Sequence, residues 1–243
     1  MRKIKVSAIS DLHGNLLDPS AFDEGDVLCI CGDIVPLDLQ RDMVKSIAWF
    51  CMKFVPWTDK LPFKKILVIF GNHDFFAEEL GPKHYNNAND VLSMLLPGSI
   101  KGEHKIQILM DSSYKYMGFT FYGTSWCPDL SNWAFYGDSE KLKKEYSKIP
   151  TNTDVLLTHC PPRFGNAGVV LQQGWNWMSN FGCQELAEEV GIKRPSWVLC
   201  GHVHSGDHHP WEIDEGSTKI VNVSLLDENY KKNYPPFNFE IEK

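Results

Sequence analysis

The chain has 243 residues, of which 43% are hydrophobic and 23% are charged, a composition typical of globular proteins. Its formal net charge of −7 argues against a protein that binds long DNA or RNA, because the phosphate backbone attracts basic surfaces. No stretch approaches the run of about 18 apolar residues that a membrane span needs, and the short N-terminal apolar run is too brief for a secretory signal.

The seven cysteines are odd in number, lie mostly inside apolar runs and include no Cys-x-x-Cys pair. This usage is typical of small buried hydrophobic residues in a reducing compartment, so we expect a cytoplasmic protein without disulfides or a thiolate zinc site. No repeat, low-complexity tract or long flexible linker interrupts the chain. A single domain over residues 1–243 is therefore expected.

Continuous apolar runs predict strands that are covered on both faces. Five such runs lie, in chain order, at 4–10, 26–32, 65–71, 154–158 and 197–201. Further strands are predicted at 105–109, in the hairpin-like segment 115–123 and at 219–226. Segment 237–242 alternates, with Phe237, Phe239 and Ile241 on one side.

Apolar residues recur at steps of three or four between Leu39 and Val55, which predicts a helix packed on the core. Further helices are predicted at 86–96, 138–148 and 182–190. Proline and glycine punctuate the joins between these segments. The pattern as a whole indicates one α/β domain.

Each of the five continuous apolar runs is followed directly by residues that can bind a metal. These residues are Asp11 and His13, then Asp33, then Asn72-His73-Asp74, then His159, and finally His202 and His204. Ligands of open α/β sheets lie outside the carboxyl ends of the strands. A single histidine of this kind is more often a core residue, but five of the nine histidines at strand ends favour one shared site.

The residue types also fit together chemically. Seven mixed oxygen and nitrogen donors are too many for one tetrahedral zinc, but they suit two cations that share a carboxylate. Without cations, burying these groups together would cost several kcal/mol in desolvation and repulsion. Two ions about 3.5–4 Å apart stabilise both the attacking and the leaving oxygen of an in-line displacement at phosphorus.

The series Asp-x-His, Gly-Asp, Gly-Asn-His-Asp, His and Gly-His-x-His extends over residues 10–204 and resembles the calcineurin-like metallophosphoesterases. Segments such as LPFKKILVIFGNHD and FTFYGTSWCPDLSNWAFYG are most similar to the brain-type metallophosphoesterase-domain (239AB-like) branch and its microbial relatives. The resemblance implies an α/β fold of two packed mixed β-sheets flanked by helices, an αββα sandwich, with the site at the strand ends.

The resemblance also implies the roles of individual residues. One metal is held by Asp11, His13, Asp33 and His204. The other is held by Asp33, Asn72, His159 and His202, with Asp33 as the bridge. His73 takes the position that binds the substrate and protonates the leaving oxygen, and a metal-activated hydroxide is the expected nucleophile. Imidazole and carboxylate donors suit manganese, iron or zinc.

Two features separate this chain from particular branches of the family. The protein Ser/Thr phosphatases carry Gly-Asp-x-x-Asp-Arg-Gly, whereas here Pro36 takes the second Asp position and the Arg is missing. This argues against protein dephosphorylation and leaves His73 without that partner. Some brain-type members replace the first His of the last motif by Gly, so the presence of His202 favours an active enzyme.

Predicted substrate contacts are Asn72, His73 and Arg163, although Arg163 is equally well explained as an exposed loop residue. Trp126, Trp133, Trp175 and Trp177 lie in loops where they could stack on a base, but such aromatics more often seal loops against the core.

The favoured function is hydrolysis of small phosphodiesters, above all cyclic or small nucleotides, with no long nucleic acid and no membrane as partner. A nuclease or phosphomonoesterase of the same family and a non-catalytic protein-binding scaffold are the alternatives. The sequence gives no indication of the oligomeric state.

Overall fold

The computed structural model describes residues 1–82, 94–96, 105–128, 130–171, 178–213 and 216–243. Its strands form two larger sheets and one small hairpin. The first sheet has the order β13-β1-β2-β3-β4, in which β13 is antiparallel to β1 and the other neighbours are parallel. Its strands are β1 (Lys3–Ile9), β2 (Gly25–Cys31), β3 (Phe63–Ile69), β4 (Ile106–Ile108) and β13 (Phe237–Glu242).

The second sheet has the order β11-β12-β10-β7-β6-β5, and only its two edge strands are antiparallel to their neighbours. Its strands are β5 (Ser112–Tyr116), β6 (Phe119–Thr124), β7 (Val155–Thr158), β10 (Trp197–Cys200), β11 (Trp211–Ile213) and β12 (Thr218–Asn222). The small hairpin pairs β8 (Val169–Leu171) with β9 (Met178–Asn180).

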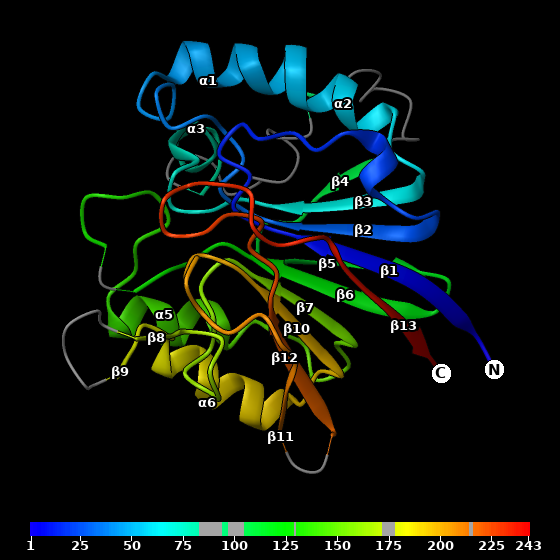
Figure 1. The fold of residues 1–243 in the computed structure, drawn as a ribbon. Helices are drawn as coiled ribbons and strands as arrows, with labels where there is room; N and C mark the ends of the chain where they lie inside the picture. Colours follow the sequence, from blue (N-terminus) through cyan, green and yellow to red (C-terminus); the bar gives the residue numbers. More distant parts are fainter. Residues whose placement is uncertain (83–93, 97–104, 129, 172–177, 214–215) are drawn as a thin grey trace.

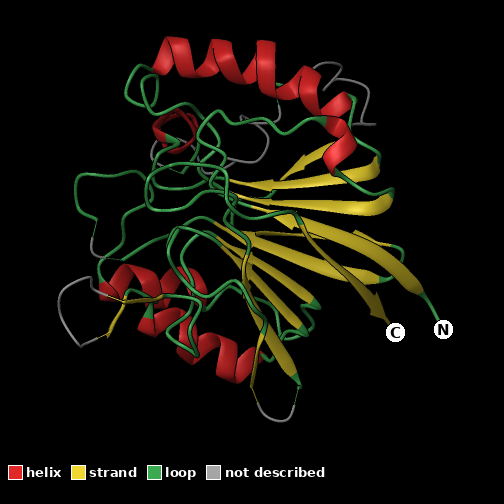
Figure 2. Ribbon diagram, in the orientation of Figure 1, coloured by secondary structure: helices red, strands yellow, loops and turns green. Residues whose placement is uncertain are grey.

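Helices cover the outer face of each sheet (Figures 1 and 2). Over the first sheet lie α1 (Met43–Trp49), the π-helical turn η2 (Phe50–Phe54), α2 (Val55–Asp59) and α3 (Phe75–Leu80). Under the second lie α5 (Ser139–Tyr146) and α6 (Gln184–Lys193). A short 3-10 turn, η1 (Pro19–Ala21), precedes β2. The predicted αββα sandwich is confirmed.

The alternation of side chains along each strand builds two separate layers of core. In β1, Val6 and Ala8 pack between the sheets against residues such as Phe121 of β6 and Leu199 of β10. Ile9, on the opposite face, belongs to the cluster that the helices cover. Because both faces of the central strands are buried, their sequences read as continuous apolar runs.

The first predicted helix is displaced along the chain. The prediction was residues 39–55, but α1 begins at Met43 because the Asp42 side chain caps it, accepting a hydrogen bond from the Lys45 backbone N–H at 3.1 Å. Met43 is 38% exposed, so only the later part of the predicted apolar stripe is core. The helical run continues to Asp59 through the wide η2 turn, which accommodates Pro56 and its missing N–H.

Other predicted elements are present with shifted ends. The strand predicted at 219–226 ends at Asn222, where the side chain turns to donate to the carbonyls of Ala167 and Val203. The predicted helices at 138–148 and 182–190 correspond to α5 and α6. The helix predicted at 86–96 lies almost wholly outside the described residues. No helix within the described ranges is both long enough and apolar enough to cross a bilayer.

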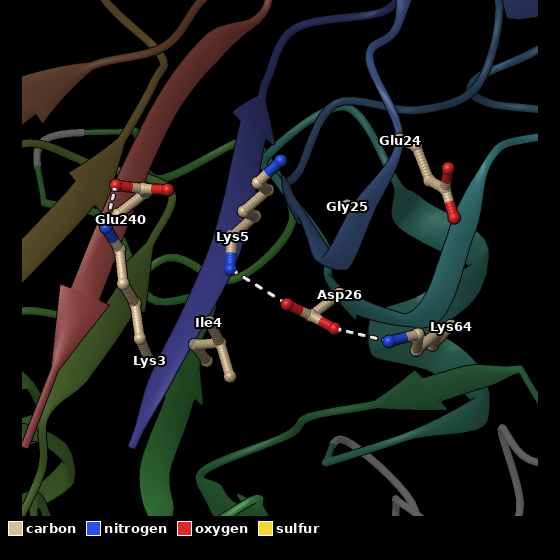
Figure 3. A pocket seen from close by; sticks show the side chains of 8 residues that line it. All are labelled: Lys3, Ile4, Lys5, Glu24, Gly25, Asp26, Lys64 and Glu240. Atoms are coloured by element: carbon tan, nitrogen blue, oxygen red, sulfur yellow. Dashed lines mark hydrogen bonds and ion pairs between the residues drawn. The ribbon is translucent and has the colours of Figure 1, made fainter. Parts of the chain in front are cut away.

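The beginnings of β1, β2 and β3 form a charged hollow (Figure 3). The Asp26 carboxylate accepts from the Lys5 backbone N–H at 2.9 Å and from Lys64 Nζ at 2.8 Å. Lys3 pairs with Glu240 of β13 at 2.5 Å. The carboxylates here are therefore largely paired, and the carboxyl ends of the same strands lie at the other edge of the sheet.

Candidate metal centre

The loops that follow five parallel strands meet at one edge of the sandwich. Backbone hydrogen bonds hold these loops together, since the N–H of Asp11 donates to Gly32 at 3.0 Å and that of His13 donates to Asp33 at 2.9 Å. In the second sheet, the Gly201 N–H donates to His159 at 2.9 Å. The strand ends therefore bring predicted ligands from both sheets to one place.

The first predicted ligand group is assembled in the structure. The His204 Nε2 lies 3.3 Å from Asp11 Oδ1, and the His13 Nε2 lies 3.5 Å from Asp33 Oδ2. The rings of His13 and His204 have centroids 5.3 Å apart. Donor atoms of Asp11, His13 and His204 all lie within 4.8 Å of one another, which is compatible with one shared cation.

The second predicted group shares Asp33 with the first. The His159 Nε2 lies 2.9 Å from Asn72 Oδ1 and 3.3 Å from Asp33 Oδ2. The ring of His202 packs against His159 with a centroid distance of 5.1 Å. Asp33 thus lies between the two groups, as a bridging carboxylate must.

Hydrogen bonds at the other ring nitrogen orient two of the imidazoles. His159 Nδ1 lies 2.8 Å from the Cys31 carbonyl, and His204 Nδ1 lies 3.0 Å from the Asp227 carbonyl. A carbonyl only accepts, so each Nδ1 carries a proton, and Nε2 of the neutral ring would have its lone pair free for a metal ion. This is the usual outer-shell arrangement of metal-bound histidines.

His13 is the clearest sign that the donor set fits a metal. Its side chain is buried, yet neither ring nitrogen has a hydrogen-bond partner in the structure. Leaving a buried polar atom unsatisfied costs about 1–3 kcal/mol, so such atoms require an explanation. A cation on Nε2 would supply the missing partner.

Several site residues have left-handed backbone conformations. Asp11, His13, Asp33 and His202 have φ values of 55°, 42°, 54° and 69°. Non-glycine residues rarely adopt this region, and such strain gathers at functional sites. The strained turns point these side chains inward directly after their strands end.

Glycines precede the ligands because the backbone passes very close to the carboxylates. A Cβ on Gly71 would lie 2.2 Å from Asp33 Oδ1, and one on Gly201 would lie 2.3 Å from Asp11 Oδ2. Glycine is therefore required at the first position of the Gly-Asn-His-Asp and Gly-His-x-His motifs, because a side chain there would collide with a carboxylate.

The electrostatics of the cluster favour bound positive charge. Burial opposes ionisation of Asp33, but the imidazoles of His159 and His73 outweigh it and hold its pKa well below the usual range. Burial likewise disfavours a charged His159, yet Asp33 raises the pKa of His159 to about 10. Two buried carboxylates thus attract a cation, either as a protonated imidazole or as a metal ion.

His73 lies at the edge of the cluster and is fixed from several sides. Its backbone N–H donates to Asp33 Oδ1 at 2.8 Å, and its ring lies against His13 and Trp133 with centroid distances of 4.6 and 4.4 Å. Its Nδ1 is hydrogen-bonded to Gln40 Oε1. Sequence reasoning missed Gln40, because only the folded loop after β2 brings it to His73.

Asp74 also has a structural role that its sequence position did not reveal. Its buried carboxylate accepts from the backbone N–H groups of Gly71, Ile34 and Val35 at 2.9–3.1 Å. It therefore ties the loop after β2 to the loop after β3. Its pKa is raised to about 7 by burial and by the neighbouring Asp33.

The cluster forms the floor of an open pocket of about 440 Å³. Asp33, Asn72, His73, His202 and His204 contribute to this floor. The remaining described lining residues are Leu130, Trp133, Val170, Phe181, Val203, Ser205, Glu228 and Tyr230. The described wall is mainly apolar and aromatic, with Glu228 as its only charged side chain.

A sequence profile of the family described as calcineurin-like phosphoesterase matches residues 4–206. The chain belongs to the calcineurin-like phosphoesterase family. Its metal-ligand motifs lie inside the matched range, and together with the His/Asp cluster they support a metal-dependent phosphoesterase.

Two curated proteins align over almost the whole chain. "UPF0046 protein T07D4.2" of Caenorhabditis elegans is 29% identical over 98% of this chain and 60% of its own length. "Metallophosphoesterase domain-containing protein 1" of Homo sapiens is 28% identical over 96% of this chain and 69% of its own length. The chain thus spans about three fifths to two thirds of these relatives. The resemblance to the brain-type branch is confirmed.

Among solved structures, the phosphopantetheinyl hydrolase of Mycobacterium tuberculosis superposes with a TM-score of 0.56 at 13% identity. The superposition covers 93% of this chain and 90% of the other. At this identity the likeness shows the calcineurin-like fold and nothing about substrate.

Arg163 does not join the calcineurin-like site, contrary to the predicted substrate contact. The chain turns away after Pro161-Pro162, and the Arg163 N–H donates to the Cys183 carbonyl at 2.9 Å. The exposed Arg163 side chain lines a separate pocket at the beginnings of α5 and α6. In the structure Arg163 is an exposed loop residue, and it is not among the described residues that line the pocket over the His/Asp cluster.

The four loop tryptophans have different outcomes. Trp126 is buried and donates to Asp111 at 2.9 Å, so it seals a loop. Trp133 lines the pocket beside His73. Trp175 and Trp177 lie outside the described residues.

Cys127 is closer to the site than its sequence context suggested. It is a free, buried cysteine whose sulfur lies within 4.8 Å of ligand atoms of His159 and His202. The general expectation of buried, unpaired cysteines holds, since all seven are free and six of them are buried.

Proposed function

We propose that the protein is a two-metal phosphodiesterase that acts on small substrates, with cyclic or small nucleotides favoured. The observation that carries the proposal is the convergence of all seven predicted donors around the shared Asp33. Asp11, His13, Asp33 and His204 would hold one cation, and Asp33, Asn72, His159 and His202 the other. Manganese, iron and zinc all suit this donor set.

When bound, the cations acidify an attacking water and neutralise charge on the phosphate oxygens. The chain itself supplies orientation and a proton. His73 lies at the pocket with its Nε2 3.8 Å from Asp33 Oδ2, where it can hydrogen-bond the substrate and protonate the leaving oxygen. Asn72 lies beside it on the pocket floor.

The composition of the pocket wall favours diesters over monoesters. No lysine or arginine is among the described residues that line the pocket, and its apolar groups include Leu130 and Phe181. A phosphate diester carries one negative charge and two organic groups, whereas a monoester carries up to two charges and one organic group. The second organic group of a diester would therefore find apolar surface, and Trp133, which lines the same pocket, is the candidate for contact with a base.

The two alternative functions, a nuclease and a non-catalytic scaffold, are less well supported. A nuclease acting on long chains would have to overcome the net charge of −7. A non-catalytic scaffold would have no need for seven converging donors. The seven unpaired cysteines suit a reducing compartment, so we propose the cytoplasm as the site of action.

The decisive experiment is an activity screen on metal-stripped protein reloaded separately with manganese, iron or zinc. The substrates are bis(p-nitrophenyl) phosphate, p-nitrophenyl phosphate and cyclic nucleotides. We expect diester hydrolysis at least tenfold faster than monoester hydrolysis, and none in an Asp33→Ala control. Metal-replete protein that hydrolyses no diester would refute the proposal and favour the scaffold.

A further inference from the structure

We propose that Gln40 is a positioning residue, which holds the imidazole of His73 in the tautomer and orientation needed for proton transfer. This inference rests on the proposed function, in which His73 protonates the leaving oxygen. It adds a residue that lies outside the metal-ligand motifs described above and that would replace the partner missing at Pro36.

The loop after β2 brings Gln40 into place. The Leu39 and Gln40 backbone N–H groups donate to the Pro36 carbonyl at 3.0 and 3.1 Å, which closes a turn between β2 and α1. Ser46 of α1 reinforces this turn by donating to the Leu39 carbonyl at 2.8 Å. The partly buried Gln40 side chain then reaches His73, and its Oε1 is hydrogen-bonded to Nδ1.

The direction of this hydrogen bond determines the chemistry. An amide oxygen only accepts, so His73 Nδ1 donates and keeps its proton. In the proposed step the oxygen of the attacking water forms a bond to phosphorus while the bond between phosphorus and the leaving oxygen breaks, and the electron pair of the broken bond passes to the leaving oxygen. His73, protonated on both ring nitrogens before the step, gives its Nε2 proton to the leaving oxygen. The neutral imidazole that remains is the Nδ1–H tautomer, which Gln40 stabilises.

The ring contacts of His73 with its aromatic neighbours do not determine which of its two nitrogens faces Gln40. Trp133 and His13 restrict the ring plane, with centroids 4.4 and 4.6 Å away. They allow a ring flip that would exchange the two nitrogens, because neither contact distinguishes Nδ1 from Nε2. The Gln40 hydrogen bond makes that distinction.

The test compares Gln40→Leu, which removes the acceptor at similar size, with Gln40→Glu, which keeps it. Gln184→Leu on α6 is the matched control, since the exposed Gln184 side chain donates a hydrogen bond to Glu188 at 3.4 Å and is not among the described residues that line the pocket at His73. Each variant is assayed with diesters of a good leaving group (p-nitrophenol) and a poor one (methanol), and its metal content is measured.

We expect Gln40→Leu to lower kcat about tenfold or more for the poor leaving group and less than about threefold for p-nitrophenol, with KM and metal content unchanged. Gln40→Glu should restore most of the lost rate. An equal loss for both leaving groups, or no loss, would overturn the proposal.

A second measurement is independent of activity. In zinc-loaded protein labelled with nitrogen-15, the ring nitrogens of His73 report the tautomer directly. We expect a protonated Nδ1 in the wild type and a mixture of tautomers in Gln40→Leu. If the wild type hydrolyses no diester but this change occurs, the positioning role stands and the proposed function fails; if the tautomer is unchanged, the positioning role fails.

Discussion

The imidazoles at the site differ in what surrounds them, and these differences suggest separate roles. His159 and His204 are oriented through Nδ1 by backbone carbonyls, whereas His73 is oriented by a side chain. Neither ring nitrogen of His13 has a hydrogen-bond partner among the described residues. In the proposed function, metal binding accounts for the surroundings of His13, His159 and His204, and proton transfer accounts for those of His73.

His73→Ala should lower kcat about 100- to 10,000-fold, because general acid catalysis contributes that much when the leaving group is poor. The two metals should remain bound, since His73 is outside both ligand groups. The measurements are steady-state hydrolysis of a diester and elemental analysis of the purified variant.

His209→Ala is the control, because the His209 side chain is 93% exposed and pairs with Asp207. It should retain wild-type turnover. A His73→Ala variant that hydrolyses diesters at the wild-type rate would show that another group protonates the leaving oxygen.

At the scale of strands and loops, the site depends on glycines that let the loops approach each other. Gly71→Ala would drive a Cβ to within 2.2 Å of Asp33 Oδ1, so the bridging carboxylate must move. We expect the variant to fold but to bind metal at least tenfold more weakly, as measured by titration of stripped protein.

Gly191→Ala provides the matched control. Gly191 lies in α6, and its added Cβ would meet nothing closer than 3.9 Å. Because glycine is a poor helix former, this change should stabilise the protein by about 0.5–1 kcal/mol and leave metal affinity unchanged. Equal metal affinity in both variants would contradict the role given to Gly71.

The charged hollow at the strand beginnings should contribute pH-dependent stability through Asp26 (Figure 3). Burial opposes its ionisation, but Lys64 and the Lys5 backbone N–H outweigh it and lower its pKa below the usual value. Because the pKa of Asp26 is lower in the folded protein than in the unfolded chain, the ionised carboxylate stabilises the fold at pH values above the unfolded-state pKa of about 3.9. This contribution is lost as the pH falls through the folded-state pKa.

Asp26→Asn should therefore cost about 1 kcal/mol or less at pH 7, in line with exposed ion pairs. The difference from the wild type should shrink as the pH falls below 4. Urea unfolding at a series of pH values measures this, and a constant difference across the series would mean that charge is not the cause.

The positions of the central strands and the convergence of their carboxyl ends could be predicted, because burial on both faces produces continuous apolar runs. The exact ends of helices and individual side-chain contacts could not be predicted from the sequence in the same way. The start of α1 depends on the Asp42 side chain, which caps the helix. The π-helical turn η2 depends on how the backbone adjusts to the missing N–H of Pro56. Gln40 escaped prediction because nothing local connects it with a histidine 33 residues away.

At the scale of the whole molecule, the candidate metal centre lies where the two sheets meet. Asp11, His13, Asp33 and Asn72 follow strands of the first sheet, whereas His159, His202 and His204 follow strands of the second. Bound cations would therefore link the two halves of the sandwich.

Adding manganese or zinc to stripped protein should raise its melting temperature. Free metal at about 100 times Kd contributes about 2.7 kcal/mol, which corresponds to about 5–10 °C for a domain of this size. Thermal unfolding followed by circular dichroism measures the shift. The same shift in Asp33→Ala would place the stabilising metal elsewhere.

Because the edge strand β13 lies near the end of this sequence, the first sheet lacks one of its strands during synthesis and is exposed to aggregation. Six residues of β13 pair with β1, which is synthesised first and lies in the interior of its sheet. Until the ribosome releases residues 237–242, β1 presents a free row of N–H and C=O groups to other nascent chains. Truncation before Phe237 should therefore promote aggregation while every predicted metal ligand is still present.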